Sequence, residues 1–325
     1  MTGFALDPEF DAAAGGLMRA LGRSAPLAVG DWATRRELVT ALMRRLDRKL
    51  PERAGVRREP WPVRAADGTE LGAVWYRPAP TTATSASGGG AGPAVLFLHG
   101  GGMILGAVDD VDREIALYAE LSGVPVLAVD YRLAPENPDP LPLEDCYAAL
   151  VAMADSAVEL GIDPGRIGVL GESAGGGLAA GVTLLARERG GPSIARQVLI
   201  YPMLDDRTTG PDEHLGRHAV WTYDDNATGW GALLGERVGG AAVAPASAPG
   251  RCVDMTDLPP AYIEVGEIDV FRDEAIAYAS RLLGAGVSCE LRVVSGVPHT
   301  YEWIAPDVTA ARRSIEERVR YLRRL

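Results

Sequence analysis

Short apolar runs alternate with longer amphipathic segments over most of the chain. The runs are AVLFLH (94–99), PVLAVD (125–130), RIGVL (166–170), RQVLIY (196–201), AYIEV (261–265) and CELRVV (289–294). Runs that are apolar on both faces and separated by helices are typical of a parallel sheet covered on its two sides. The pattern therefore predicts an α/β fold with a mostly parallel central sheet flanked by helices.

The segments between these runs carry helix and turn signals. VDREIALYAELSG and GGGLAAGVTLLARERGG both end at glycine, and DVFRDEAIAYASRLLGAG repeats apolar residues at helical spacing. Asp67-Gly68 stands between two strand-like stretches, which predicts a β-hairpin and antiparallel strands at the start of the sheet. Residues 81–92, of low complexity, are predicted to form a loop and not a domain boundary.

Two segments do not follow this alternation. Residues 1–55 contain a charged helix with a predicted apolar stripe made of Leu38, Leu42, Leu46 and Leu50. Residues 204–257 are rich in turn formers but include aromatic residues: Trp221, Tyr223 and Trp230. A long insertion after a strand predicts a lid over the carboxyl ends of the strands, where open α/β sheets bind ligands.

Composition excludes several classes of partner. The 325 residues carry a net charge of −12, which argues against nucleic acid or an anionic membrane as partner because both need a basic face. The acidic N-terminus has no basic start followed by an apolar stretch, so we predict a cytoplasmic protein. Cys146, Cys252 and Cys289 lack metal-ligand spacing, which favours reduced structural thiols over a disulfide framework or a zinc site.

Gly171-Glu172-Ser173-Ala174-Gly175 matches G-x-S-x-G between a strand and a helix. In that context the tight turn lifts the serine hydroxyl above the sheet and makes it a candidate nucleophile. A glycine-rich nucleotide-binding turn is the alternative, but the G-x-G-x-x-G spacing is absent. This motif favours the nucleophile over the nucleotide-binding turn.

A second motif, His99-Gly100-Gly101-Gly102, follows a buried strand. An HGGG stretch there supplies backbone N–H groups to an oxyanion, and glycine lets the backbone approach a substrate closely. The alternative is a mobile glycine loop, and for His99 itself we favour a structural hydrogen bond. The two motifs in this order predict a serine hydrolase.

The sequence resembles the hormone-sensitive-lipase-like branch of the α/β-hydrolase esterases. The resemblance rests on HGGG (99–102), DYRLAPENP (130–138), GESAG (171–175), GEIDVFRDE (266–274) and VPHTYE (297–302). It implies a catalytic body of 56–203 and 258–325, with a helical cap made of 1–55 and 204–257. It also allows a homodimer through an edge of the sheet.

The chain departs from the family pattern at pocket-lining or supporting positions. Met103 stands where relatives often carry an aromatic residue, Asn137 replaces a histidine, and Thr300-Tyr301 replaces a Gly-Phe pair. We take Met103, Trp221 and Tyr301 as candidate substrate contacts. A flexible thioether adapts to irregular ligands, so Met103 favours a branched or bulky group; a purely structural Met103 is nearly as well supported.

The remaining catalytic residues follow from chain order, which in α/β-hydrolases is serine, acid, histidine. His214, His218 and His299 follow Ser173, but the first two lie in the predicted lid. A general base must be held rigidly, which favours His299 on the loop after the last strand. Asp269 matches the family's acid position, and Glu267 stays open as the alternative.

The predicted chemistry is ester hydrolysis through an acyl-enzyme. Ser173 attacks, His299 moves the proton, and the N–H groups of Gly101, Gly102 and Ala174 hold the oxyanion. The mechanism needs no metal or cofactor, and the expected partner is a small-molecule ester of short to medium length. An acyltransferase, lactonase or amidase would use the same residues, and a non-catalytic receptor on this scaffold is the other alternative.

Overall fold

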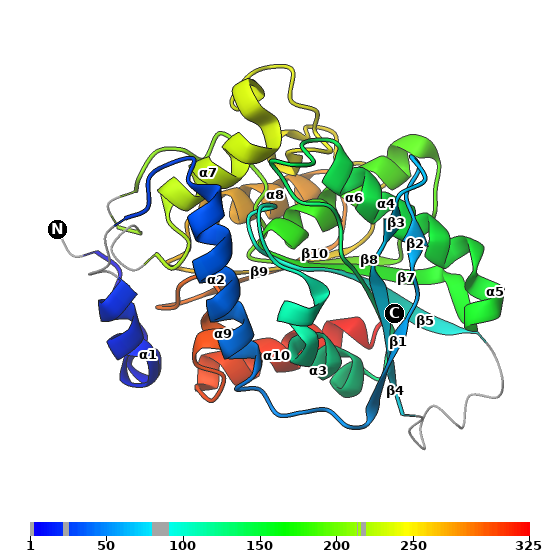
Figure 1. Cartoon of the computed structure of the whole chain (residues 1–325), viewed down its shortest axis with the longest axis horizontal. Coiled ribbons are helices and arrows are strands. Elements are labelled where there is room, and N and C mark those ends of the chain that lie inside the picture. Colours follow the sequence, from blue (N-terminus) through cyan, green and yellow to red (C-terminus); the bar gives the residue numbers. More distant parts are fainter. Residues whose placement is uncertain (1–2, 22–25, 80–90, 213, 216–218) are drawn as a thin grey trace.

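The computed structural model describes residues 3–21, 26–79, 91–212, 214–215 and 219–325. Within these residues, an eight-stranded sheet runs through the centre of the structure (Figure 1). The strands lie in the order β1-β4-β6-β5-β7-β8-β9-β10. Their bounds are β1 Val56–Pro60, β4 Ala73–Pro78, β5 Gly92–Leu98, β6 Val126–Val129, β7 Ile162–Glu172, β8 Arg196–Ile200, β9 Ala261–Gly266 and β10 Cys289–Val294.

The pairing of the strands confirms the prediction of a mostly parallel sheet. β1 pairs antiparallel with β4, and β4 pairs antiparallel with β6. Every later neighbour in the sheet is parallel, from β6 and β5 through to β9 and β10. The predicted hairpin is also present, because β2 (Val63–Arg64) and β3 (Glu70–Leu71) pair antiparallel across Asp67-Gly68, but they form a small sheet of their own.

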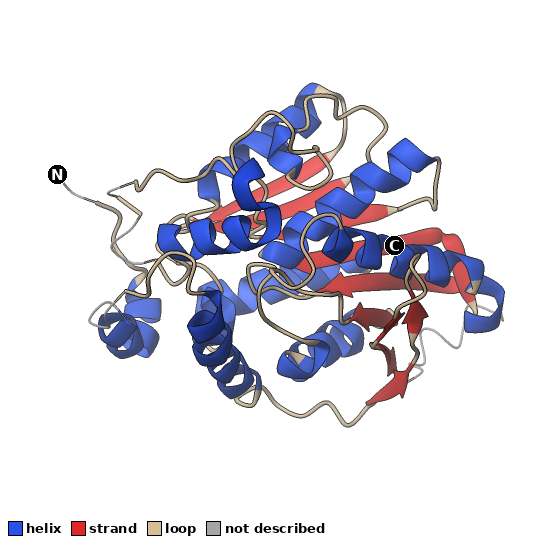
Figure 2. Cartoon of the chain, turned by 45° about the horizontal axis from the view of Figure 1, so that its top comes forward, coloured by secondary structure: helices blue, strands red, loops and turns tan. Residues whose placement is uncertain are grey.

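Helices cover both faces of the sheet (Figure 2), so strands such as β6 are buried along their whole length. α3 and α10 contact each other on one face, and α4 packs against α6 on the other. Gly123 and Gly190 end α3 and α6 in the left-handed conformation, as their sequences predict. The helices are α1 Pro8–Leu21, α2 Trp32–Asp47, α3 Asp112–Ser122, α4 Leu141–Asp155, α5 Ala157–Leu160, α6 Ala174–Arg189, α7 Tyr223–Leu234, α8 Arg272–Gly284, α9 Tyr301–Ile304 and α10 Thr309–Leu322.

The predicted leucine stripe is only partly correct. Leu46 and Leu50 are buried, but the side chain of Leu38 is 56% exposed. Residues spaced by four advance about 40° beyond a full turn at each step, so a stripe of three such steps drifts away from one face. Val39 and Met43 complete the inward face of α2 instead.

The N-terminal segment is tied to the insertion at 204–257. The buried Arg35 of α2 donates from Nε to Oδ1 of Asp225 on α7 at 2.7 Å, and Gly30 N donates to the hydroxyl of Thr228 at 3.0 Å. These contacts join two segments that lie far apart in sequence. Residues 81–90 of the predicted loop, and His218, lie outside the described residues.

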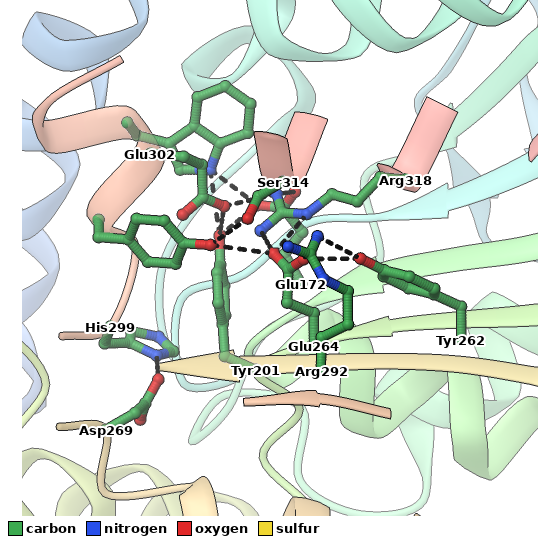
Figure 3. A network of polar contacts seen from close by, with 12 residues as sticks. Glu172, Tyr201, Tyr262, Glu264, Asp269, Arg292, His299, Glu302, Ser314 and Arg318 are labelled. Carbon is green, nitrogen blue, oxygen red and sulfur yellow. Dashed lines mark hydrogen bonds and ion pairs between the residues drawn. The ribbon is translucent and has the colours of Figure 1, made fainter. Parts of the chain in front are cut away.

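A buried arginine ties the last helix to the middle of the sheet (Figure 3). Arg318 of α10 is fully buried, and its guanidinium lies 2.5 Å from both Glu264 on β9 and Glu302 on α9, and 3.7 Å from Glu172 at the end of β7. Burial opposes ionisation of Glu264, but the charge of Arg318, the hydrogen bonds from Arg318 and Tyr262 and the charge of Arg292 together lower its pKa. Burial raises the pKa of Glu302 despite Arg318, and the negative charge of Glu172 adds to the rise.

We predict that removing this cation destabilises the fold strongly. Arg318→Met leaves buried carboxylates without a counter-ion, so the free energy of unfolding should fall by about 3–5 kcal/mol. Arg320→Met, on the same helix, breaks the more exposed pairs with Glu290 and Glu317 and should cost about 1 kcal/mol or less. Urea unfolding at pH 7 measures both variants, and equal losses would contradict the prediction.

Candidate active site

Ser173 stands at a sharp turn between β7 and α6. Its φ is 55°, in a region that side-chain-bearing residues rarely adopt. Glycine is required on both sides: a Cβ on Gly171 would lie 2.0 Å from the carbonyl oxygen of Gly175, and one on Gly175 would lie 1.9 Å from that of Leu98. The G-x-S-x-G pattern therefore reflects a turn too crowded for any other residue at these two positions.

The structure brings Ser173, His299 and Asp269 into one chain of hydrogen bonds. Nε2 of His299 lies 3.0 Å from Oγ of Ser173, and Nδ1 lies 2.7 Å from Oδ2 of Asp269. The other oxygen of Asp269 accepts from the backbone N–H of Phe271 at 3.0 Å. All three catalytic candidates are at least 95% buried, so few competing water contacts surround them.

The other candidates for the acid and for the histidine lie outside this chain of hydrogen bonds. Glu267 accepts from the backbone N–H of Gly296 at 2.9 Å and so braces the loop before His299, without contacting the imidazole. The ring of His214 lies edge-on to Phe4, with ring centroids 6.3 Å apart. Of the two acids left open by the sequence, Asp269 is the one that the fold places against His299.

Two aromatic rings hold the imidazole, and the sequence did not indicate either. Tyr201 and Phe271 meet His299 edge-on, with ring centroids 4.5 and 5.3 Å away. The hydroxyl of Tyr201 donates toward Glu172 and Glu302 at 2.9 and 2.8 Å, which links the imidazole to the buried carboxylates of Figure 3. The only sequence signal was the place of Tyr201 directly after the buried run of β8.

The predicted oxyanion donors lie on two segments next to Ser173. Gly101 and Gly102 have φ of 120° and 59°, and Ala174 begins α6. Among the described residues, the N–H groups of these three residues donate to no protein acceptor. The N-terminus of a helix favours negative charge, so Ala174 adds the field of α6 to this group of donors.

The insertion packs directly on the HGGG loop. A Cβ on Gly102 would lie 2.5 Å from the ring of Trp221, and one on Gly229 of α7 would lie 2.7 Å from the carbonyl oxygen of Gly102. Glycine at 102 therefore lets Trp221 lie against the backbone. Trp221 also lines the cavity described below, whereas its contact with a substrate stays a prediction.

His99 lies behind this loop and not in the cavity. Its ring stacks on Tyr131 with centroids 4.3 Å apart, and its Nδ1 lies 2.7 Å from the carbonyl oxygen of Gly100. The hydroxyl of Tyr131 donates to the carbonyl oxygen of His99 at 2.8 Å. These contacts give His99 the structural hydrogen bond that the sequence analysis favoured, and they explain the tyrosine of the DYRLAPENP motif.

A cavity of about 190 Å³ opens at Ser173 and His299. Its walls include residues of α1, α2, the HGGG loop, α3, the start of α7 with the segment before it, and α9. Most of the lining is apolar: Leu17, Val39, Leu42, Met43, Leu46, Leu50, Val111, Val220, Trp221, Trp303 and Ile304.

Two of the predicted substrate contacts are corrected by the structure. Met103 is 1% exposed and does not line the cavity; its methyl group lies under α6, near Gly177. Tyr301 is fully buried, with its hydroxyl against Glu264 and Ser314. Both stand next to motif residues, but the positive φ of Met103 and the short helix α9 turn their side chains into the core.

The fold agrees with comparisons with known proteins. The family model for the alpha/beta hydrolase fold matches residues 95–302. The chain belongs to the alpha/beta hydrolase family. Esterase LipI of Mycobacterium tuberculosis is 39% identical over 226 residues, which cover 67% of this chain and 68% of the relative.

Solved structures resemble the whole chain. A bacterial heroin esterase superposes with a TM-score of 0.85 at 36% identity, over 98% of both chains. A hyperthermophilic esterase from the archaeon Pyrobaculum calidifontis gives 0.84 at 30% identity, over 99% of both. These similarities confirm the resemblance to α/β-hydrolase esterases that the motifs indicated.

We predict that Ser173 and His299 are both required for turnover. Ser173→Ala and His299→Ala should each lower kcat for a short p-nitrophenyl ester by about three orders of magnitude or more, with the fold intact. His214→Ala, outside the hydrogen-bonded chain, should stay within about tenfold of the unmodified protein. Steady-state kinetics and circular dichroism test this, and a Ser173→Ala protein that keeps most of its activity would refute the mechanism.

The two acids give a separate prediction. Asp269→Asn removes the charge that orients His299 and stabilises its cation, so kcat should fall by about three orders of magnitude. Glu267→Gln keeps an oxygen for the N–H of Gly296 and should change kcat by less than about tenfold. The opposite ranking of these two variants would assign the acid role to Glu267.

Proposed function

We propose that the chain is a carboxylesterase that hydrolyses short to medium soluble esters through an acyl-enzyme on Ser173. The observation that carries this proposal is the 3.0 Å contact between Oγ of Ser173 and Nε2 of His299, beside three backbone N–H groups that donate to no acceptor in the described part of the chain. A relative that is 39% identical over 226 residues and a solved structure that is 36% identical over 98% of both chains are named as esterases. Ester hydrolysis is therefore the function that both geometry and family support.

The mechanism follows from the positions of these groups. His299 takes the hydroxyl proton as Oγ of Ser173 forms a bond to the ester carbonyl carbon, and Asp269 stabilises the imidazolium. The N–H groups of Gly101, Gly102 and Ala174 hold the negative oxygen. His299 then gives the proton to the leaving alcohol, and a water repeats the sequence to release the acid.

The cap is part of this proposal. We assign residues 1–55 and 204–257 to it and 56–203 with 258–325 to the catalytic body. Residues of α1, α2 and the segment before α7 line the cavity, so a substrate is enclosed by elements outside the sheet. An enclosed apolar cavity suits a limited acyl or alcohol group better than a lipid surface.

The location of the protein and its oligomeric state are predictions from the sequence. No helix of the described residues is long and apolar enough to cross a membrane. The cytoplasmic location and the homodimer rest on sequence and resemblance. A non-catalytic receptor is disfavoured because His299 is present and lies within hydrogen-bonding distance of Ser173.

The size of the cavity predicts the chain-length preference. With p-nitrophenyl acetate, butyrate, hexanoate, octanoate and palmitate, kcat/KM should peak at short or medium length, because longer chains exceed the enclosed volume. A kcat/KM that rises steadily to palmitate would contradict the proposal. Met103→Phe should leave the ratio of rates on linear and branched esters unchanged, since Met103 does not line the cavity.

A further inference from the structure

The cavity is apolar except for a group of carboxyl side chains. The carboxyl side chains that line it are those of Asp47, Glu114, Glu172 and Asp225, while no lysine or arginine among the described residues lines it. Buried carboxyl groups are costly unless something compensates them, so each needs a partner that can be named.

Two of these carboxylates have partners within the protein. Asp225 pairs with the buried Arg35 at 2.7 Å and accepts from Thr222 at the start of α7. Glu172 accepts from the hydroxyls of Tyr118 and Tyr201 and from the indole N–H of Trp303, at 2.8–3.0 Å. The carboxylates of Asp225 and Glu172 therefore stabilise the fold.

Glu114 is different. It is 94% buried on α3, and among the described residues no amide or cation donates to its carboxyl group, which meets only that of Glu172. Burial raises the pKa of Glu114 well above its usual value, and the charge of Glu172 adds to the rise. Next to it, Asp47 accepts the N–H groups of Arg113 and Glu114 with one oxygen, and burial raises its pKa to about 6.

We propose that Glu114, assisted by Asp47, binds a protonated amine at this end of the cavity, so that the preferred substrates are esters that carry a cationic group. The inference rests on the proposed esterase function, because the same cavity holds Ser173. It names Glu114 as a residue that determines specificity and takes no part in the chemical step.

The physical reason lies in the charges around Glu114. Asp47 of α2, Glu172 of β7 and Glu302 of α9 all face it with negative charge. In the free protein a proton on Glu114 relieves this repulsion. An ammonium group can take the place of that proton, donate to the carboxylate and leave its alkyl carbons against the apolar walls.

The test compares esters that match in shape but differ in charge. 2-(Dimethylamino)ethyl butyrate, which carries the amine in its alcohol group, is compared with 3-methylbutyl butyrate. p-Nitrophenyl 6-(dimethylamino)hexanoate, which carries the amine in its acyl group, is compared with p-nitrophenyl 7-methyloctanoate. For at least one pair, the ratio of kcat/KM at pH 7 should favour the cationic ester by about tenfold, the factor expected for one charge-assisted hydrogen bond.

Substitutions test whether the preference for the cationic ester comes from Glu114 and Asp47. Glu114→Gln should lower the ratio about fivefold or more, and Asp47→Asn, which keeps an oxygen for the two α3 amides, should lower it by a smaller factor. Glu37→Gln is the matched control, because it removes the same charge from the exposed face of α2, outside the cavity. It should leave the ratio unchanged, which separates local binding from general attraction by the net charge of −12.

The outcomes distinguish this inference from the proposed function. Turnover of the neutral esters supports the esterase whatever the ratio is. A ratio near one for both pairs in the unmodified protein would overturn the inference, and so would an equal loss in Glu37→Gln and Glu114→Gln. If Glu114→Gln does not fold, the ratio in Asp47→Asn decides: an unchanged ratio overturns the inference.

Discussion

The guanidinium group of Arg318 holds together the three chain segments that carry the catalytic residues. It binds Glu264, on the strand that leads to Asp269, and Glu302, three residues after His299. It also lies 3.7 Å from Glu172, the neighbour of Ser173. The outermost of these segments, at Ser173 and His299, are 126 residues apart in sequence, so one buried cation fixes their mutual positions in a way that local structure cannot.

The burial of this network has an energetic consequence. Three carboxyl groups surround one buried arginine, and Arg292 adds a second cation at 3.0 Å from Glu264 only. Excess negative charge therefore remains on the side that faces Glu172 and the cavity. Burial raises the pKa of Glu302 and of Glu114, and this excess charge adds to the rise, so a proton or another cation is favoured there.

Close backbone contacts provide the other constraint. The glycines at 171, 175 and 102 each stand where a Cβ would meet neighbouring atoms within 2.5 Å. Because Gly102 touches Trp221, the oxyanion loop is fixed by the cap as well as by the sheet. The enclosure of the cavity and the geometry of the catalytic residues therefore depend on the same contacts.

The sequence by itself determined what depends on neighbours along the chain. The alternation of strands and helices and the hairpin at Asp67-Gly68 are set by local periodicity and turn residues. The turn at Ser173 is marked by glycines, of which Gly171 is crowded by its neighbour Gly175 and Gly175 by Leu98 on β5. Tertiary structure decided which of two nearby acids meets His299, and it turned Met103 and Tyr301 into the core. It also decided the roles of Glu114 and Arg318, because the partner of a buried charge lies on distant segments, and no spacing along the chain records which segments will meet.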